Sequence, residues 1–142
     1  QKPLSIEQKE KFQKVLQSFG FEFLDDKKSR IIEKIKALVI DLISNKNNEL
    51  NINYSQYLSK NLGLDYSYIS NLFSSTENIT IEKYIIHKKI EKVKELIIYD
   101  EMNLNEIADL LNYSSVQALS SQFKKITGFT PSHYKNMRKI SK

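Results

Sequence analysis

An internal repeat constrains the fold of this chain more than any other feature. The stretch that begins at Leu58 matches the one that begins at Ile107 with an offset of 49 residues, and after the turn in each copy the offset becomes 50. The turn positions are Gly63 and Asn112, two residue types that accept a positive φ. The later matches are Ile69 with Leu119, Ser70 with Ser120, Phe73 with Phe123, Thr80 with Thr130 and Tyr84 with Tyr134. Each copy therefore predicts a helix, a tight turn, a second helix and a stop.

A long amphipathic segment joins the two copies. Between residues 81 and 99, isoleucine and valine recur at helical spacing, with lysine and glutamate on the other side. Asn103 then predicts the N-cap of the next helix, with Glu106 at the capping-box position. We expect helix-turn-helix units at about 54–75 and 104–126, held apart by a rigid linker helix.

Composition favours a helical domain without cysteine chemistry. The chain has 142 residues with three Gly, two Pro and no Cys, so long loops are improbable and disulfides, thiolate metal sites and cysteine nucleophiles are excluded. No apolar run approaches the roughly 18 residues of a membrane span. His87 and His133 have no paired carboxylate motif, which argues against a metal site. We expect a cytoplasmic protein that has no cofactor, metal or membrane partner and is not an enzyme.

The first 27 residues predict a separate piece of structure. Apolar spacing predicts a helix over 5–18, Gly20 is expected to end it, and 21–24 predicts a short strand. A helix and strand in this order look like the end of a small α+β domain, of the ferredoxin-like kind. The chain starts with Gln1 instead of Met, which suggests that it is a fragment of a longer protein.

A second long helix is expected to follow this remnant. Its apolar face runs from Ile31 to Ile43, and the polar run 45–51 after it predicts a loop. Asp25 and Asp26 are expected to cap the start of the helix, where their negative charge interacts favourably with the helix dipole. The two carboxylates also resemble a general acid and base pair, but no other chemical group accompanies them.

Positive charge is concentrated in the second copy of the repeat. The chain has a net charge of +5, and no acidic residue follows Asp109. Six cationic residues do follow it: Lys124, Lys125, Lys135, Arg138, Lys139 and Lys142. The second helix of a helix-turn-helix unit can lie in a DNA major groove, although such helix pairs also arise from ordinary packing. The basic surface would attract phosphate groups, which favours DNA as the partner.

The motifs of the second copy resemble the DNA-binding domain of the AraC/XylS-type transcription regulators. They are Ile107-Ala108 with Tyr113, Leu119-Ser120, Phe123-Lys124-Lys125, Gly128-Phe129-Thr130-Pro131 and Tyr134-Lys135. The first copy is similar but less distinctive, at Leu62-Gly63-Leu64, Tyr68-Ile69-Ser70 and Leu72-Phe73. The resemblance implies an all-α domain of two helix-turn-helix units over residues 28–142, in a bacterial regulator of transcription that binds DNA.

The resemblance also places base-facing residues on the second helix of each unit. These candidates are Ser67, Tyr68, Ser70 and Asn71 in the first unit, and Ser115, Val116, Gln117 and Ser121 in the second. Tyr66 is a further candidate for touching DNA, whereas Tyr113, Phe123, Phe129 and Tyr134 are expected to pack in the core. Lys88, Lys124 and Lys125 are expected to meet phosphate.

The sequence departs from the family pattern in ways that bear on base reading. Asn112 stands where the family usually has glycine, and Asn71 and Ser121 stand where it often has arginine. Without arginine the two helices lack the common bidentate contact to guanine, and the amides of Asn71 and Gln117 pair most naturally with adenine.

Double-stranded DNA is the expected partner. Most members of the family carry a separate effector-binding or dimerisation domain, so a homodimer through a missing N-terminal domain and contact with RNA polymerase are further expectations. The rival hypothesis is a helical protein-interaction module without DNA affinity, since Asp65 and Glu77 offset Lys60 in the first unit. Some alkyl-transfer DNA-repair proteins also contain this domain, but their acceptor chemistry needs the cysteine that is absent here.

Overall fold

The computed structural model describes residues 6–44 and 53–140, and every regular element in those ranges is an α-helix. The helices in chain order are α1 (Ile6–Ser44), α2 (Tyr54–Leu62), α3 (Tyr66–Glu77), α4 (Ile81–Tyr99), α5 (Leu104–Leu110), α6 (Val116–Thr127) and α7 (Pro131–Ile140). The expected all-α DNA-binding fold is confirmed. The polar run at 45–51, for which we expected a loop, lies outside the described residues.

Helix α1 corrects our expectations for the N-terminal part of the chain. It is a single helix of 39 residues, so the strand prediction at 21–24 is wrong and Gly20 does not end a helix. A lone glycine costs a helix interior only about 1 kcal/mol relative to alanine, and propagation through it avoids the cost of a new nucleus. Asp25 and Asp26 lie inside α1 with exposed side chains, and therefore do not cap it.

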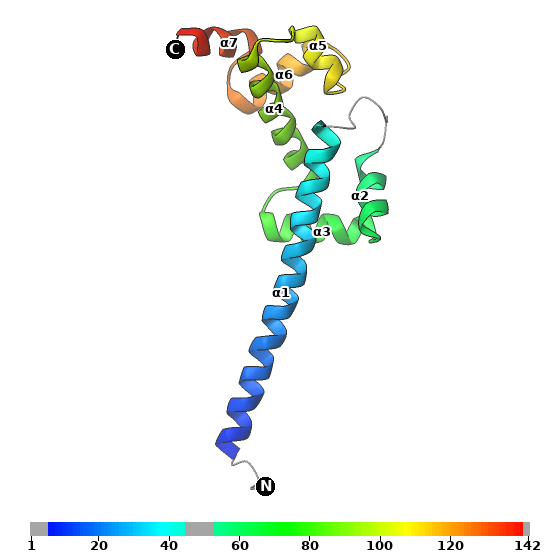
Figure 1. The fold of residues 1–142 in the computed structure, drawn as a ribbon, viewed down its shortest axis with the longest axis vertical. Coiled ribbons are helices and arrows are strands. Elements are labelled where there is room, and N and C mark those ends of the chain that lie inside the picture. Colours follow the sequence, from blue (N-terminus) through cyan, green and yellow to red (C-terminus); the bar gives the residue numbers. More distant parts are fainter. Residues whose placement is uncertain (1–5, 45–52, 141–142) are drawn as a thin grey trace.

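Only the C-terminal part of α1 belongs to the packed domain. It carries a buried stripe of Ile32, Ile35, Val39 and Ile43, which joins the main hydrophobic core. This part packs against α2, α3 and α4, while the N-terminal half of α1 extends away from the other helices (Figure 1). The assignment of residues 1–27 to another domain stays a prediction.

The repeat in the sequence is a repeat in the structure. Helices α2 and α3 form the first helix-turn-helix unit, and α5 and α6 form the second. The turn residues have the positive φ that we expected, 64° at Gly63 and 59° at Asn112. Matched core positions are buried alike, since Phe73 and Phe123 both have no exposed surface. The two units therefore share one internal design.

Helix α4 connects the units as the sequence predicted. Thr80 caps its start by accepting a hydrogen bond from the backbone N–H of Lys83 at 3.2 Å. Its 19 residues span about 28 Å, and a buried stripe runs along its length. That stripe consists of Ile81, Ile85, Ile90, Val93 and Ile97. The units pack near the two ends of α4 (Figure 1), so this helix sets their separation.

The second unit begins with the capping box that we expected. The side chain of Asn103 accepts from the backbone N–H of Glu106 at 2.8 Å, and the Glu106 carboxylate accepts from the backbone N–H of Asn103 at 3.1 Å. Helix α5 therefore starts at a position that the local sequence specifies.

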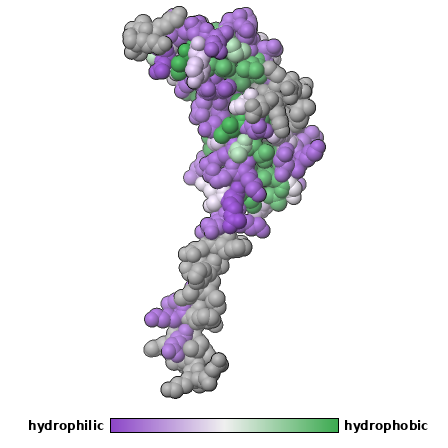
Figure 2. Space-filling model, viewed as in Figure 1, coloured by the Kyte–Doolittle hydropathy of each residue, from purple (hydrophilic) through white to green (hydrophobic). Residues whose placement is uncertain are grey.

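One aromatic residue that we expected in the core lies at the surface. Phe123 is buried and both Tyr113 and Tyr134 are half-buried, but Phe129 is 41% exposed. Phe129 follows Gly128, whose φ of 86° turns the chain between α6 and α7, and its ring stacks on His133 with 5.2 Å between centroids. Phe129 therefore adds to the exposed apolar surface of the domain. On the face drawn in Figure 2, hydrophobic colour is confined to patches.

Candidate nucleic-acid interface

Helix α3 presents a neutral, polar outer face. Ser67, Tyr68 and Asn71 are exposed, and Tyr68 retains 46% of its accessible surface. Ser70 is half-buried, at the edge of this face. The opposite side of α3 carries Ile69, Leu72 and Phe73, all of them buried. This amphipathic division fixes which side chains α3 can offer to a partner.

A cluster of two tyrosines and a carboxylate holds the start of α3. The hydroxyl groups of Tyr54 and Tyr66 donate to the same Glu82 oxygen at 3.2 and 3.1 Å, and the two rings meet edge to face. Tyr66 is thus a positioning residue with a half-buried ring, and its contact with DNA stays a prediction. The cluster ties together the first turns of α2, α3 and α4.

Titration in this cluster follows from its hydrogen bonds and burial. The backbone N–H of Glu82 itself is the main cause that lowers the pKa of the Glu82 carboxyl, and the hydroxyls of Tyr66 and Tyr54 lower it further. Burial is the main cause that raises the pKa of both tyrosines. The cluster therefore stays a carboxylate with two phenol donors at neutral pH.

An ion pair fixes the other end of α3 to α1. The Lys36 ammonium lies 2.5 Å from the Glu77 carboxylate, at the last residue of α3. Hydrogen bonding to Glu77 is the main cause that raises the pKa of Lys36. Both ends of α3 are therefore attached to neighbouring helices.

Helix α6 presents a second polar face, at the positions that match the outer face of α3 in the repeat. Gln117 and Ser121 are exposed one turn apart, at an offset of 50 from Ser67 and Asn71. Ser115 is the N-cap, where its hydroxyl oxygen accepts from the backbone N–H of Ala118 at 3.0 Å.

Val116 is half-buried against the core, so among the second-unit candidates it has the least surface to offer. The structure thus brings Gln117 and Ser121 to the outer side of α6 and leaves Ser115 exposed at its N-cap. Val116 stands at the edge of that face.

The buried side of α6 is anchored by aromatic and polar contacts. Phe123 and Leu119 are buried on this side. The Tyr113 hydroxyl donates to the side-chain oxygen of Gln122 at 2.6 Å, and the Lys89 ammonium lies 5.2 Å from the centre of the Tyr113 ring. Burial raises the pKa of Tyr113 to about 12 and lowers the pKa of Lys89. These contacts fix the rotation of α6 and so its outer face.

The cationic side chains differ in whether the fold already uses them. Lys124 and Lys125 are exposed in the last turn of α6 and form no ion pair with the described part of the chain. Lys88 pairs with Glu91 at 3.2 Å and lies over the Tyr84 ring. Lys135 pairs with Asp100 at 2.6 Å. The positive charge of Lys135, which we included in the basic surface on sequence grounds, is therefore paired within the fold.

One exposed residue on the outer face of α3 was missed by the sequence reasoning. Ser75 lies one turn beyond Asn71, and its hydroxyl donates to the carbonyl oxygen of Leu72 at 3.2 Å. The offset of 50 matches Ser75 with Lys125, so the repeat alone could have predicted that Ser75 lies on the outer face.

Comparison with known proteins identifies this pair of units. The pattern of a family described as a helix-turn-helix domain matches residues 58–137, more than half of the chain. The chain belongs to the AraC-type helix-turn-helix family. A probable transcriptional regulator, LumQ of Photobacterium leiognathi, is 28% identical over 110 residues, which cover 78% of this chain and 43% of LumQ. The chain spans less than half the length of the curated relatives that it matches first.

Solved structures of AraC-type domains share the fold. The C-terminal domain of the response regulator yesN from Fusobacterium nucleatum superposes with a TM-score of 0.58 at 28% identity, over 70% of this chain and 96% of that domain. The DNA-binding domain of AdpA, solved in complex with a target DNA, gives a TM-score of 0.64 at 14% identity, over 76% of this chain and 95% of that one. At this identity the second match bears on the fold alone.

The described residues of this AraC-type domain hold neither a membrane-spanning helix nor a metal-binding cluster. No helix there is long and apolar enough to cross a membrane. No group of three or more His, Asp or Glu side chains in residues 6–44 and 53–140 is arranged to hold a metal ion.

Proposed function

We propose that this domain binds double-stranded DNA by placing α3 and α6 in two successive major-groove segments, within a bacterial, cytoplasmic regulator of transcription. The observation that carries the proposal is the repetition of one exposed face. Ser67 and Asn71 on α3 recur as Gln117 and Ser121 on α6. Each exposed pair lies on a helix whose other side carries the matched buried phenylalanine, Phe73 or Phe123. A rigid helix between the units would hold the two faces about one DNA turn, ~34 Å, apart.

The outer faces supply hydrogen-bonding groups suited to base edges. Asn71 and Gln117 carry the amides, which can pair in a bidentate way with adenine, and the neighbouring serines can pair with several bases. Tyr68 adds an exposed ring on α3, able to contact a thymine methyl group. The proposed function is binding without catalysis.

The phosphate contacts are expected to be unequal between the units. Lys124 and Lys125 are exposed on α6. The corresponding positions on α3 are Ser74 and Ser75, which carry no charge. Lys88 would have to leave Glu91 to reach a phosphate. We therefore expect the second unit to provide most of the salt-dependent affinity.

The remaining expectations concern the longer protein. A segment before the domain would provide an effector-binding or dimerising part, and the N-terminal half of α1 leads toward it. RNA polymerase is a further partner that a regulator of transcription would contact. The division of the chain into a remnant at 1–27 and a DNA-binding domain at 28–142 is part of this proposal.

The rival function is a helical protein-interaction module. It is favoured by one observation: the outer side of α3 carries no cation, and the first unit holds Asp65 and Glu77. A protein partner would not give the steep salt dependence that DNA binding through lysines gives.

Salt-dependent retention on a duplex of random sequence separates the two functions. The logarithm of the binding constant should fall linearly with the logarithm of salt concentration, with a slope of about −0.9 per phosphate and for roughly five phosphates. Changing Lys124 and Lys125 to glutamine should reduce the slope by about two such contributions. The matched control changes Lys27 and Lys28, an exposed adjacent pair on α1, to glutamine and should keep the parent slope. No retention at low salt, or equal slopes for the two double variants, would contradict DNA docking through α6.

A further inference from the structure

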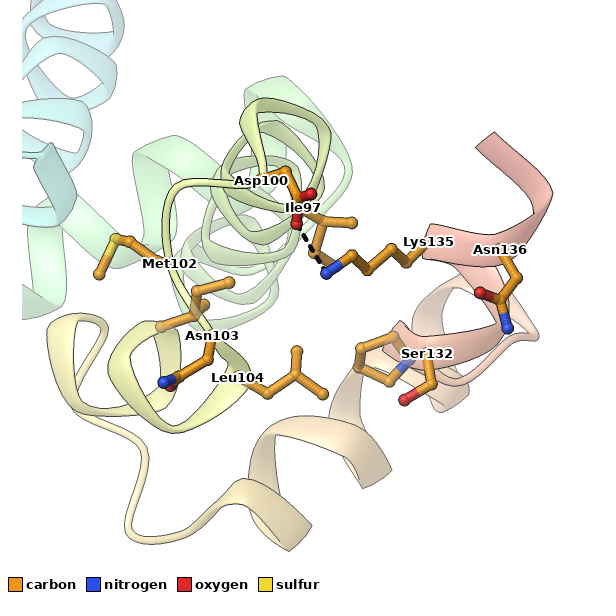
Figure 3. A pocket seen from close by; sticks show the side chains of 10 residues that line it. Ile97, Asp100, Met102, Asn103, Leu104, Ser132, Lys135 and Asn136 are labelled. Atoms are coloured by element: carbon orange, nitrogen blue, oxygen red, sulfur yellow. Dashed lines mark ion pairs between the residues drawn. The ribbon is translucent and has the colours of Figure 1, made fainter. Parts of the chain in front are cut away.

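A cavity of about 450 Å³ opens between the end of α4, the start of α5 and the first turns of α7. Its floor is apolar and consists of Ile97, Leu104, Ile107 and Pro131, with Met102 beside them. Its rim is polar and consists of Asp100, Asn103, Ser132, Lys135 and Asn136 (Figure 3). This size lies within the range of about 300–1,000 Å³ that is typical of small-molecule sites.

The repeat explains why the second unit has this space. In the first unit, the first residue of α2 is Tyr54, whose hydroxyl reaches Glu82 in the first turn of α4. In the second unit, the residue that matches Tyr54 at the offset of 49 is Asn103, and the residue that matches Glu82 at the offset of 50 is Ser132. Both of these smaller residues line the cavity. The pair of side chains that meets in the first unit is therefore replaced by one that leaves a gap.

The rim carries a cation that a ligand can reach. The Lys135 ammonium lies 2.6 Å from the Asp100 carboxylate, and the two side chains are 39% and 55% exposed. The dashed line in Figure 3 marks this pair, which joins the end of α4 to α7. An ion pair of this exposure contributes little to stability, so another carboxylate can take the place of Asp100.

Two features of the rim favour an anion over a cation. Asp100 already shows that a carboxylate is accepted beside Lys135. Ser132 and Lys135 also lie in the first turns of α7, whose N-terminal end favours negative charge. The apolar floor below them requires an apolar body on the same molecule.

We propose that this cavity binds a small carboxylic acid, whose apolar body lies against Leu104, Ile107 and Pro131 and whose carboxylate pairs with Lys135. The proposal does not depend on DNA binding, because none of these residues lies on the outer faces of α3 and α6. The ligand takes the place of the Asp100 carboxylate beside Lys135, and the Asp100 side chain is already 55% exposed.

The test uses two probes of the same shape, 3-phenylpropanoate and its neutral amide, 3-phenylpropanamide. Each is titrated into the ¹⁵N-labelled chain, and amide shifts are followed for the cavity residues and for the outer face of α6. The acid should give saturable shifts around the cavity and bind on the order of tenfold more tightly than the amide, since only the acid forms a charge-assisted hydrogen bond. Lys135→Met should bring the acid to the affinity of the amide. The matched control Lys125→Met, which removes an exposed lysine from α6, should leave the preference intact.

A second variant enlarges two side chains that line the cavity. Leu104→Tyr combined with Ser132→Glu should fill the cavity and abolish binding of both probes, while the amide spectrum and the thermal melt report whether the chain is folded. If that variant does not fold, the Lys135→Met comparison decides alone. The proposal is wrong if the acid gives no saturable shifts at millimolar concentration, if acid and amide bind equally, or if a folded double variant still binds the acid. Shifts that arise only on the outer face of α6 would also overturn it, because they would mark the acid as a mimic of DNA phosphate.

Discussion

The rings of Phe123 and Tyr134 meet edge to face, with 5.6 Å between their centroids and 68° between their planes. The matched pair in the first unit, Phe73 and Tyr84, has the same angle and a centroid distance of 5.2 Å. In each unit this pair joins the outer helix of the helix-turn-helix to the helix that follows it. One repeated aromatic contact therefore helps to orient both α3 and α6.

Truncating this pair should cost stability in a graded way. Phe123→Ala removes a fully buried ring and should lower the free energy of unfolding by about 3–5 kcal/mol. Tyr134→Leu keeps an apolar side chain and should lose only the edge contact and part of the packing, about 1 kcal/mol. Urea denaturation of both variants measures the difference. Equal losses in the two variants would show that the ring of Phe123 does not pack as described.

Gly63 should respond to substitution through backbone geometry. A Cβ at Gly63 would have no heavy atom within 4 Å, so Gly63→Val should be strained only by its φ of 64°. A β-branched residue at such a φ costs on the order of 1–3 kcal/mol. The control is Asn112→Gly, at a φ of 59°, which should be neutral or mildly stabilising. Thermal melts decide, and a Gly63→Val protein that melts like the parent would contradict the left-handed turn.

The features that could be predicted from the sequence are those that depend on residues close together in the chain. The two turns, the linker helix and the capping box of Asn103 each depend on residues within a few positions of one another. The apolar spacing placed the buried side of both outer helices correctly for the same reason. Exposure of Ser67, Asn71, Gln117 and Ser121 follows from that spacing.

What the sequence did not predict depends on residues far apart in the chain. Lys135 meets Asp100 across the end of α4, so a count of charges along the sequence overestimated the free cations of the second unit. Tyr66 turns toward Glu82, a contact that no local spacing specifies. The continuity of α1 through Gly20 is a further case. The helical residues on both sides of Gly20 stabilise the helix by more than the low helix propensity of one glycine destabilises it.

The stability supplied by Tyr113 should depend on pH in the alkaline range. Burial raises its pKa to about 12 in the folded state, whereas the unfolded value is about 10. The contribution is therefore complete below pH 10 and is lost as the pH rises toward 12, because the unfolded state releases the proton first. Tyr113→Phe, which loses the hydrogen bond to Gln122, should cost about 1 kcal/mol at pH 8.

The difference in unfolding free energy between parent and Tyr113→Phe should then shrink from pH 10 upward. Urea denaturation at a series of pH values measures this difference. A difference that stays constant between pH 9 and pH 11 would show that the Tyr113 hydroxyl is not held in the folded state as described.

Selection of bound duplexes from a random pool tests the central claim most directly, with the parent chain, Asn71→Ala and Gln117→Ala run in parallel. The account predicts a parent site with A·T pairs in two segments about ten base pairs apart. Asn71→Ala should relax preference in one segment and Gln117→Ala in the other, with salt slopes unchanged because an amide neutralises no phosphate. Identical selected sites for all three proteins, or a parent site with a single segment, would contradict the reading of DNA by both α3 and α6.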